Sequence, residues 1–207
     1  MQNPIRLVGS SGFTLIELMV TMTIAGILAG IAIPNMRTFL QNNRIASTGN
    51  DLLHSIQIAR TEAIKRQLTA GGTVSVCATA DSTLVDDSLT CSYGNFSQWF
   101  VFVDTNGNGQ HAAGEPVLGR GAASTTNTVK SNQNGIVCFA STGFANPACS
   151  TRVPTSAVAI CDSRGNVAIG ANSTARALFI AQTGRARISQ LFADVTTAIS
   201  TIGGTCP

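Results

Sequence analysis

The feature that most constrains this chain is a run of 21 apolar or small residues, Phe13 to Ile33, in which the one ionisable group is Glu17. At about 1.5 Å per residue, a helix of this length crosses the roughly 30 Å hydrocarbon core of a bilayer. The run is too long for an ordinary secretory h-region, and no small-x-small cleavage site follows it. The leader before it carries a single charge, Arg6. The positive-inside bias therefore places the leader in the cytoplasm and the rest of the chain beyond the membrane.

A carboxylate inside a membrane helix is costly unless it has a partner. The stretch Gly12 to Glu17, GFTLIE, resembles the prepilin signature of type IV pilins and type II secretion pseudopilins. The resemblance implies that a prepilin peptidase cleaves after Gly12 and methylates Phe13. It also implies that Glu17 pairs with the N-terminal amine of a neighbouring subunit. The alternative is a plain membrane anchor whose Glu17 snorkels to the interface.

The helix is expected to continue past Pro34, which lacks an N–H and disfavours helical geometry at Ile33. Many pilins have a helix-bending proline at this place, and we expect a kink or a locally melted turn. Beyond it, apolar residues recur at helical spacing and predict one buried stripe. These residues are Ile45, Leu52, Ile56, Ala59 and Ala63.

After Gln67 the pattern changes to short β-rich runs separated by Gly, Asn, Asp and Ser. The predicted strands are Thr73–Ala78, Trp99–Val103, Gly135–Phe139, Ser156–Cys161, Ala175–Ala181 and Arg185–Ser189. The predicted fold class is α+β, a long kinked helix packed on an antiparallel β-rich domain. This order resembles the GspH/FimT group of minor pilins and pseudopilins. The expected segments are a leader (1–12), a transmembrane and filament-core helix (13–33), its amphipathic continuation (34–67) and a globular domain (68–207).

In the globular part, the resemblance rests on three stretches that are diagnostic only together. They are Phe100 to Asp104 with the following Asn/Gly loop and Gly114-Glu115-Pro116, Cys161 to Gly165, and Gly184 to Arg187.

Six cysteines all follow the apolar run, and none form the C-x-x-C pairs of zinc or redox sites. An even count beyond a membrane-entry signal predicts disulfides in an oxidising compartment, although reduced core cysteines remain an alternative. Six cysteines allow 15 pairings. We expect Cys77–Cys91, Cys138–Cys149 and Cys161–Cys206, the last of which would fasten the C-terminal tail.

One loop satisfies the calcium pattern D-x-[DN]-x-[DN]-G-x5-E, with Asp104, Asn106, Asn108 and Glu115 as the oxygen donors. Its flanks predict strands instead of the helices of that motif, and Asn and Gly also build ordinary β-turns. No other cofactor is expected. Calcium is therefore one hypothesis for this loop, and a plain turn is the other.

Basic residues gather in the C-terminal half, where an anionic partner would bind. Gln182-Thr183-Gly184 predicts a hairpin turn, after which Arg185 and Arg187 share one strand face, about 6.7 Å apart. That spacing is close to the spacing of phosphates along a nucleic-acid strand. Gly184, Arg185 and Arg187 match the Gly-Arg-x-Arg motif of FimT-type pilins, which implies DNA binding. The alternative is a solvated strand edge.

Arg164 and Arg176 are further bases that we expect near this strand. No recognition helix or row of stacking aromatics is present, so any contact with duplex DNA would be independent of base sequence.

No catalytic motif is present, and neither His54 nor His111 has an evident nucleophile or metal partner, so no enzyme activity is expected. Three function classes stay open: a structural minor pilin, a DNA-capturing pilin of natural transformation, and a GspH-type pseudopilin of type II secretion. The expected partners are other major and minor pilins, the prepilin peptidase, the inner-membrane assembly platform and duplex DNA. The expected location is the inner membrane with the globular domain in the periplasm, and then the pilus or a periplasmic pseudopilus.

Overall fold

The structure is a computed structural model that describes residues 12–69, 71–92, 94–132, 135–146 and 156–206. Its first element is a 52-residue helix, α1, Leu15–Arg66. The chain divides into two compact units, residues 1–40 and 41–207, so that the boundary lies within α1. The predicted α+β class, a long apolar helix followed by antiparallel sheets, is confirmed.

The first sheet, sheet A, has the strand order β3-β2-β1-β5, and all its pairings are antiparallel. Its strands are β1 (Thr73–Ala78), β2 (Gln98–Asp104), β3 (Val117–Ala122) and β5 (Ile136–Phe139). The segment between β1 and β2, with a short 3-10 turn η1 (Asp86–Ser88), brings Leu89 and Cys91 against the outer face of this sheet. Phe100 and Phe102 lie beneath them and are fully buried.

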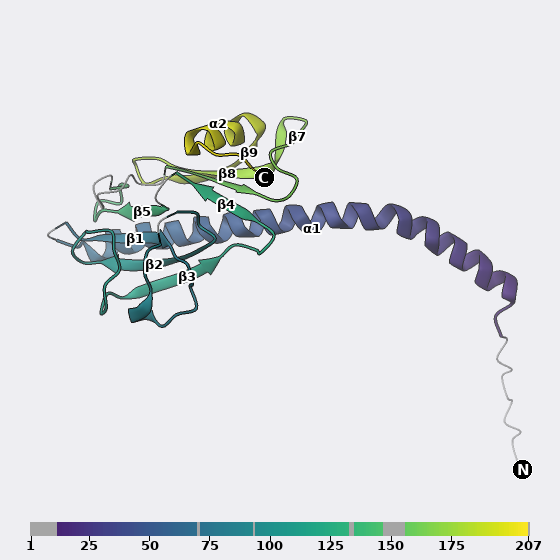
Figure 1. Ribbon diagram of the computed structural model, residues 1–207, viewed down its shortest axis with the longest axis horizontal. Coiled ribbons are helices and arrows are strands. Elements are labelled where there is room, and N and C mark those ends of the chain that lie inside the picture. Colours follow the sequence, from purple (N-terminus) through teal and green to yellow (C-terminus); the bar gives the residue numbers. More distant parts are fainter. Residues whose placement is uncertain (1–11, 70, 93, 133–134, 147–155, 207) are drawn as a thin grey trace, which may run out of the picture. The chain divides into compact units, whose positions relative to one another are not determined.

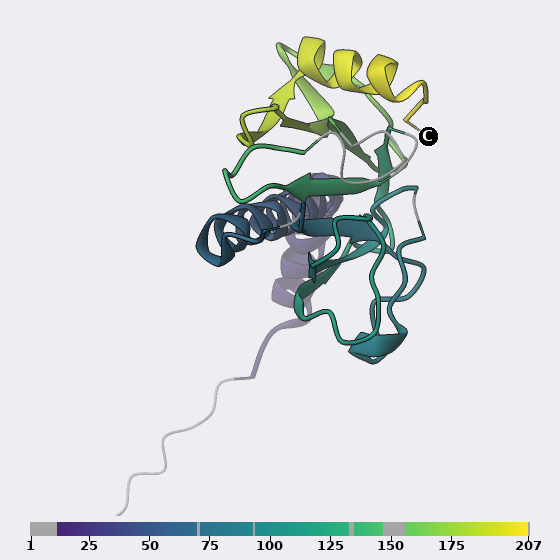
Figure 2. The same ribbon diagram turned by 90° about the vertical axis from the view of Figure 1, so that its left-hand side faces the viewer.

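The second sheet, sheet B, has the order β4-β6-β8-β7, and β9 also pairs with β8. Its strands are β4 (Thr128–Ser131), β6 (Ala157–Cys161), β7 (Ala168–Ile169), β8 (Asn172–Ile180) and β9 (Ala186–Leu191). A second helix, α2 (Phe192–Ile202), follows β9 directly. It covers the face of sheet B that points away from α1 (Figures 1 and 2). Small alanine side chains of that face pack against Val195 and Ala198.

The C-terminal half of α1 packs against both sheets and forms the main core with them (Figure 2). The predicted apolar stripe is confirmed, because all five of its residues are buried. Gly49 brings the helix close to sheet B, since a Cβ there would lie 3.3 Å from Ile160 Cδ1. On the side of sheet A, the buried Trp99 donates its indole N–H to Ser55 Oγ at 2.9 Å. The C-terminal half of α1 and the two sheets therefore share one hydrophobic core.

The six predicted strands are all present: β1 has the predicted bounds, and the ends of the others shift by up to three residues. Among the described residues, β3, β4, β7 and α2 were not predicted. β3 contains Gly119 and Gly121, which are rare in strands, and Gly121 is required because a Cβ would lie 2.3 Å from the Trp99 ring. The β-branched residues of α2 disfavour helix, and burial of one face outweighs that preference.

The locally melted turn expected at Pro34 is absent, since α1 is helical on both sides of it. A proline leaves the carbonyl four residues earlier without its N–H donor. Side chains next to this gap bond the backbone, with Asn35 Nδ2 donating to Ile31 O at 3.1 Å and Thr38 Oγ1 donating to Pro34 O at 3.3 Å. Both bonds go to neighbouring carbonyls and not to Gly30 O itself, and side-chain bonds to the carbonyl four residues back favour a slight bend of a helix.

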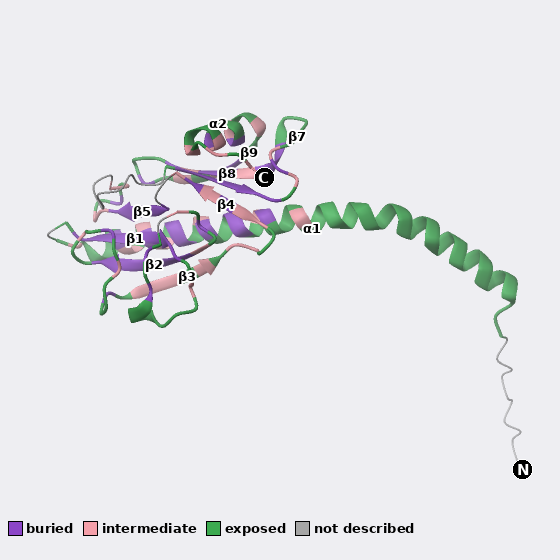
Figure 3. Ribbon diagram, in the orientation of Figure 1, coloured by how far each residue is buried: buried purple, intermediate pink, exposed green. Residues whose placement is uncertain are grey.

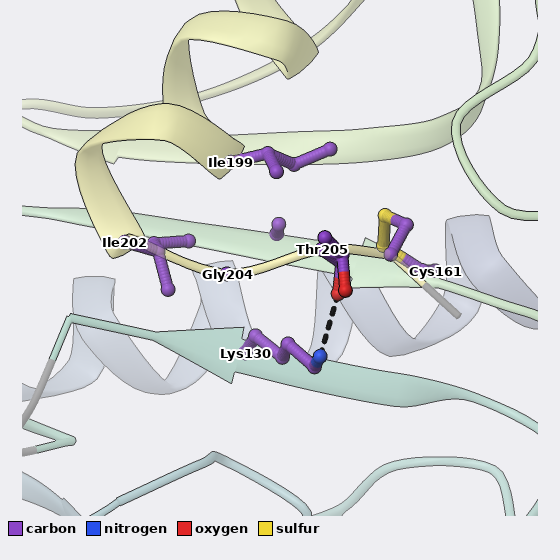
Figure 4. A pocket seen from close by; sticks show the side chains of 8 residues that line it. Lys130, Cys161, Ile199, Ile202, Gly204 and Thr205 are labelled. Atoms are coloured by element: carbon purple, nitrogen blue, oxygen red, sulfur yellow. Dashed lines mark hydrogen bonds between the residues drawn. A yellow bond between two sulfur atoms is a disulfide. The ribbon is translucent and has the colours of Figure 1, made fainter.

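Two of the predicted disulfides, Cys77–Cys91 and Cys161–Cys206, are present. The third pairing, Cys138–Cys149, lies outside the described residues because Cys149 does. Cys161–Cys206 fastens the tail after α2 to β6, and Lys130 of β4 donates to the carbonyl of Thr205 beside it (Figure 4). The tail is thus held to sheet B by one covalent and one polar link.

Candidate functional site

The N-terminal end of α1 carries the predicted processing and assembly residues. Gly12 and Phe13 are exposed, and Phe13 has 86% of its surface accessible. Glu17 Oε2 accepts hydrogen bonds from the backbone N–H and the hydroxyl of Thr14, both at 2.9 Å. In return, Thr14 Oγ1 accepts the backbone N–H of Glu17 at 3.3 Å. This is a capping box, which stabilises the start of the helix.

The capping box adds a role for Glu17 that the sequence reading missed, although T-x-x-E at the start of an apolar run is its usual signal. Within one chain, one oxygen of the Glu17 carboxylate thus already accepts two hydrogen bonds. It remains exposed, so that it is free to meet a group of a second molecule.

The first half of α1 has no packing partner among the described residues. Every residue from Gly12 to Leu40 is exposed, which is visible as the continuous green part of the helix in Figure 3. Within the part of the chain that the structure describes, α1 is the one helix long and apolar enough to cross a membrane. An apolar surface of this size must be covered by lipid or by other subunits.

The predicted strand Arg185–Ser189 corresponds to β9, which begins one residue later, at Ala186, so that Arg185 directly precedes it. We call the segment that carries Arg185 and Arg187 the arginine strand. β9 pairs antiparallel with β8, and the turn is closed by hydrogen bonds from Gly184 N–H to Ala181 O and from Ala181 N–H to Arg185 O, both 2.9 Å. The predicted alternation is present, because Ala186 and Ile188 pack on the core while Arg185 and Arg187 point to the other face. The two arginines line an open groove of about 400 Å³ together with Phe179 of β8.

The two arginines differ in what they already contact. Arg187 Nη1 lies 2.9 Å from Asp194 Oδ2, and its guanidinium carbon stands 4.6 Å from the centre of the Phe179 ring. Hydrogen bonds from Ser189 and Arg187 lower the pKa of Asp194, so its charge persists at neutral pH. No such partner of Arg185 lies in the described parts of the chain. A phosphate would meet Arg185 directly, and it would have to compete with Asp194 for Arg187.

Arg164 and Arg176 do not join this surface, contrary to expectation. Arg164 forms an ion pair with Asp162 at 2.7 Å and donates to Asn42 of α1 at 2.9 Å. Arg176 pairs in register with Ile160, whose side chain packs against α1. Arg176 therefore projects from the face of sheet B opposite to the one that carries Arg185 and Arg187. Burial, and secondarily the charge of Arg164, lower the pKa of Arg176. The strand period of two separates these bases from Arg185 and Arg187.

Gly184 has a structural role of its own. It is buried with φ of +76°, and a Cβ would lie 1.9 Å from the carbonyl oxygen of Gly143. Arg60 of α1 bridges the two loops by donating to Gly143 O at 3.1 Å and Thr183 O at 3.3 Å. A glycine at the start of the Gly-Arg-x-Arg motif is therefore needed for packing, whatever the arginines bind.

The oxygens of the predicted calcium loop accept hydrogen bonds within the loop. The fully buried Asp104 carboxylate accepts the backbone N–H groups of Gly107 and Gly109, both at 2.7 Å. Glu115 accepts those of Thr105 at 2.8 Å and Ala112 at 2.9 Å. Burial is the main cause of the raised pKa of Asp104.

The two amides of this loop act in the same way. Asn106 Oδ1 accepts the N–H of Asn108 at 3.0 Å, and Asn108 Oδ1 accepts the N–H of Gln110 at 2.7 Å. These hydrogen bonds make a stable turn. Calcium binding stays a prediction, which calorimetry with calcium on the full chain would test. An absence of heat at millimolar ion would end that idea.

His111 is a structural contact between this loop and the segment over sheet A. Its two ring nitrogens lie 2.9 Å from Leu89 O and 3.0 Å from Glu115 O. His54 lines an exposed hollow on α1. Over the described ranges, no three His, Cys, Asp or Glu side chains come together in a way that could hold a metal ion.

Comparison with known proteins agrees with this geometry. Residues 9–33 match the model of the prokaryotic N-terminal methylation motif, which implies processing by a prepilin peptidase and association with other pilins. Residues 48–184, more than half of the 207-residue chain, match the model of the type II transport protein GspH. No curated protein and no solved structure matches the chain significantly. With its methylation motif, its long apolar helix and its antiparallel sheets, the chain belongs to the GspH family of type IV pilin-like minor pilins and pseudopilins.

Proposed function

We propose that this protein is a minor subunit of a type IV pilus. After cleavage behind Gly12 and methylation of Phe13, it is held in the inner membrane by α1, with its globular unit in the periplasm. The inner-membrane assembly platform then moves it into the filament. The observation that carries this proposal is the wholly exposed apolar half of α1 with a single carboxylate, Glu17, near its start. Such a surface suits a helix that exchanges lipid for the helices of other subunits.

Capture of duplex DNA during natural transformation is the specific role that we propose for the exposed arginine strand. Arg185 and Arg187 offer two guanidinium groups on the wall of one open groove. Guanidinium groups bind phosphate with paired donors, and this interaction carries no base specificity. Because Arg187 is already paired with Asp194, Arg185 is the stronger of the two phosphate ligands.

Salt dependence tests this role. With the full chain in neutral detergent, Arg185→Gln/Arg187→Gln should flatten the slope of log affinity against log salt by about two units, close to one for each phosphate that is no longer neutralised. Arg176→Gln, on the opposite face of sheet B, is the matched control and should leave the slope unchanged. An equal effect of both variants, or no effect of the double variant, would remove the arginine strand as a DNA site.

A pseudopilin of the type II secretion system is the second candidate. It is supported by the description of the matching family, a type II transport protein. In that role the same helix would assemble a periplasmic pseudopilus that moves folded proteins outward, and the arginine strand would have no part.

A deletion strain separates the candidates. Piliation, DNA uptake and release of exoproteins are measured in parallel, with the wild-type gene restored as the control. We expect loss of piliation and DNA uptake with unchanged exoprotein release. Loss of exoprotein release with normal pili would instead assign the chain to secretion.

A further inference from the structure

The end of sheet B carries a small exposed apolar surface. Val167, Ile169 and Leu191 have 52%, 58% and 51% of their surface accessible. Ile169 pairs with Asn172 of β8, which pairs with Leu191 of β9. Ile169 and Leu191 thus flank Asn172 in one row across three strands, with Val167 two residues before Ile169. We name these three side chains the hairpin surface.

The backbone beneath the hairpin surface is firmly held. Thr174 Oγ1 accepts the N–H of Val167 at 3.0 Å and donates to Gly165 O at 2.7 Å. The N–H of Phe192 donates to Ala171 O at 3.0 Å, which ties the start of α2 to the hairpin turn. These hydrogen bonds hold the backbone beneath the three apolar side chains, which are exposed.

The hairpin surface begins close to the place where α1 joins the sheets. Arg164, three residues before Val167, donates to Asn42 Oδ1 at 2.9 Å. Asn42 follows the end of the apolar run, Ile33, by nine residues, which is about 14 Å of helix. The chain between the apolar run and the segment that carries the hairpin surface is therefore short.

The charges in this region are mostly positive. Between Glu17 and Asp51 the chain carries two ionised residues, Arg37 and Arg44, and both are basic. Arg164 and Arg176 add two more from sheet B, of which Arg164 is paired with Asp162. Asp194, three residues after Leu191, is paired with Arg187. Apolar side chains on a segment whose neighbours carry more arginines than acids suit the interface of anionic membranes.

We infer that the hairpin surface docks on the anionic phospholipid surface of the membrane that α1 spans. Val167, Ile169 and Leu191 enter the interface, and the arginines meet the lipid phosphates. The inference goes beyond the proposed pilus function, since it concerns the subunit before it leaves the bilayer. Docking would hold the globular unit against the membrane until assembly pulls it away.

Fluorescence quenching by lipid tests the inference on the full chain in vesicles, without any other filament subunit. Ile169→Trp places a reporter on the hairpin surface, and Val85→Trp, at a site 72% exposed over sheet A, is the control. Trp99 is buried and common to both variants. In vesicles of brominated phosphatidylglycerol, we expect the added tryptophan of Ile169→Trp to lose about half of its emission, and that of Val85→Trp to keep nearly all of it. In brominated phosphatidylcholine the quenching should fall.

Several results would overturn the inference. Quenching of Ile169→Trp as weak as that expected for Val85→Trp would show that the hairpin surface does not touch lipid, and strong quenching of both would show lipid contact that is not specific to this surface. Equal quenching in the anionic and the zwitterionic lipid would remove the role of charge. If the added tryptophan of Ile169→Trp is not quenched by brominated lipid, but its emission shifts to the blue as the protein density in the vesicles rises, the surface would be assigned to a second copy of the chain. Since no filament forms in these vesicles, none of these results bears on the pilus proposal.

Discussion

The two halves of α1 have opposite relations to the rest of the chain. From Gln41 to Arg66, the helix buries an apolar stripe between two sheets. From Leu15 to Leu40, every side chain is exposed, although this half is the more apolar one. Hydrophobic burial is the dominant favourable term in folding, so a half that stays uncovered indicates that its partners are other molecules.

The comparison shows that one helix serves two tasks. Its second half specifies the fold of the globular unit, and its first half specifies what that unit is attached to. Substitutions in the two halves should therefore have separable effects, on folding in one half and on association in the other.

The largest effect on folding is expected from Leu52→Ala. Leu52 is fully buried in the core that α1 forms with the sheets. Removing a buried leucine side chain should lower the free energy of unfolding by about 3 kcal/mol. Leu28→Ala, at a site 62% exposed in the first half, should change it by less than about 0.5 kcal/mol.

Denaturant unfolding of the full chain in micelles, followed by the emission of Trp99, measures both variants. Trp99 is a suitable reporter because it is buried and hydrogen-bonded to α1. A loss with Leu28→Ala as large as that with Leu52→Ala would contradict the division of the helix.

A smaller effect is expected where Arg60 of the second half of α1 bridges two loops. Gly184→Ala would place a Cβ 1.9 Å from Gly143 O at a positive φ, and should lower the free energy of unfolding by about 2 kcal/mol. Gly170→Ala is the matched control, since Gly170 has φ of +62° and nothing within 4 Å of the added Cβ. It should cost about 1 kcal/mol from backbone strain alone.

The same unfolding measurement compares the two glycine variants. Equal losses would mean that the close approach to Gly143 relaxes without cost. In that case the glycine would be required by the hairpin turn and not by the bridge to α1.

The sequence was sufficient for features with strong local signals. The apolar stripe of α1 and the alternation of Arg185 and Arg187 follow from periodicity, and the structure contains both. The C-terminal helix was missed, although Val195, Ala198, Ile199 and Ile202 recur at spacings of three, one and three and Gly203 closes the helix with φ of +68°. Its Thr and Ile residues have low helix propensity, so the sequence did not predict this helix, which tertiary packing stabilises.

The missed features of the site depend on contacts between distant segments. Nothing in the local sequence tells that Arg176 shares a face with Ile160, or that Asp194 reaches Arg187. The register of sheet B decides the first, and the start of the unpredicted helix α2 directly after β9 decides the second. The role of Gly184 also needed the structure, because the atom that excludes a Cβ belongs to Gly143, in another loop.

The smallest effect on folding, and the sharpest test of the first half of α1, is expected at its N-terminal end. Thr14→Ala removes the capping hydroxyl and should speed amide exchange over the first turn, a local loss of about 1 kcal/mol. Glu17→Gln keeps a side chain that serves a capping box and should leave that exchange nearly unchanged. Neither variant should change unfolding of the globular unit.

In filament assembly the two variants should rank the other way, with the larger effect from Glu17→Gln. If the carboxylate meets the amine of a neighbouring subunit, Glu17→Gln removes the charge that makes the pair and should abolish incorporation into filaments, whereas Thr14→Ala should assemble. Sheared filaments probed for the subunit give this readout, with the membrane level of each variant as the control. Normal incorporation of Glu17→Gln would leave Glu17 as a helix cap alone. Its carboxylate would then need no partner in the membrane, and the exposed apolar surface would remain the reason for association.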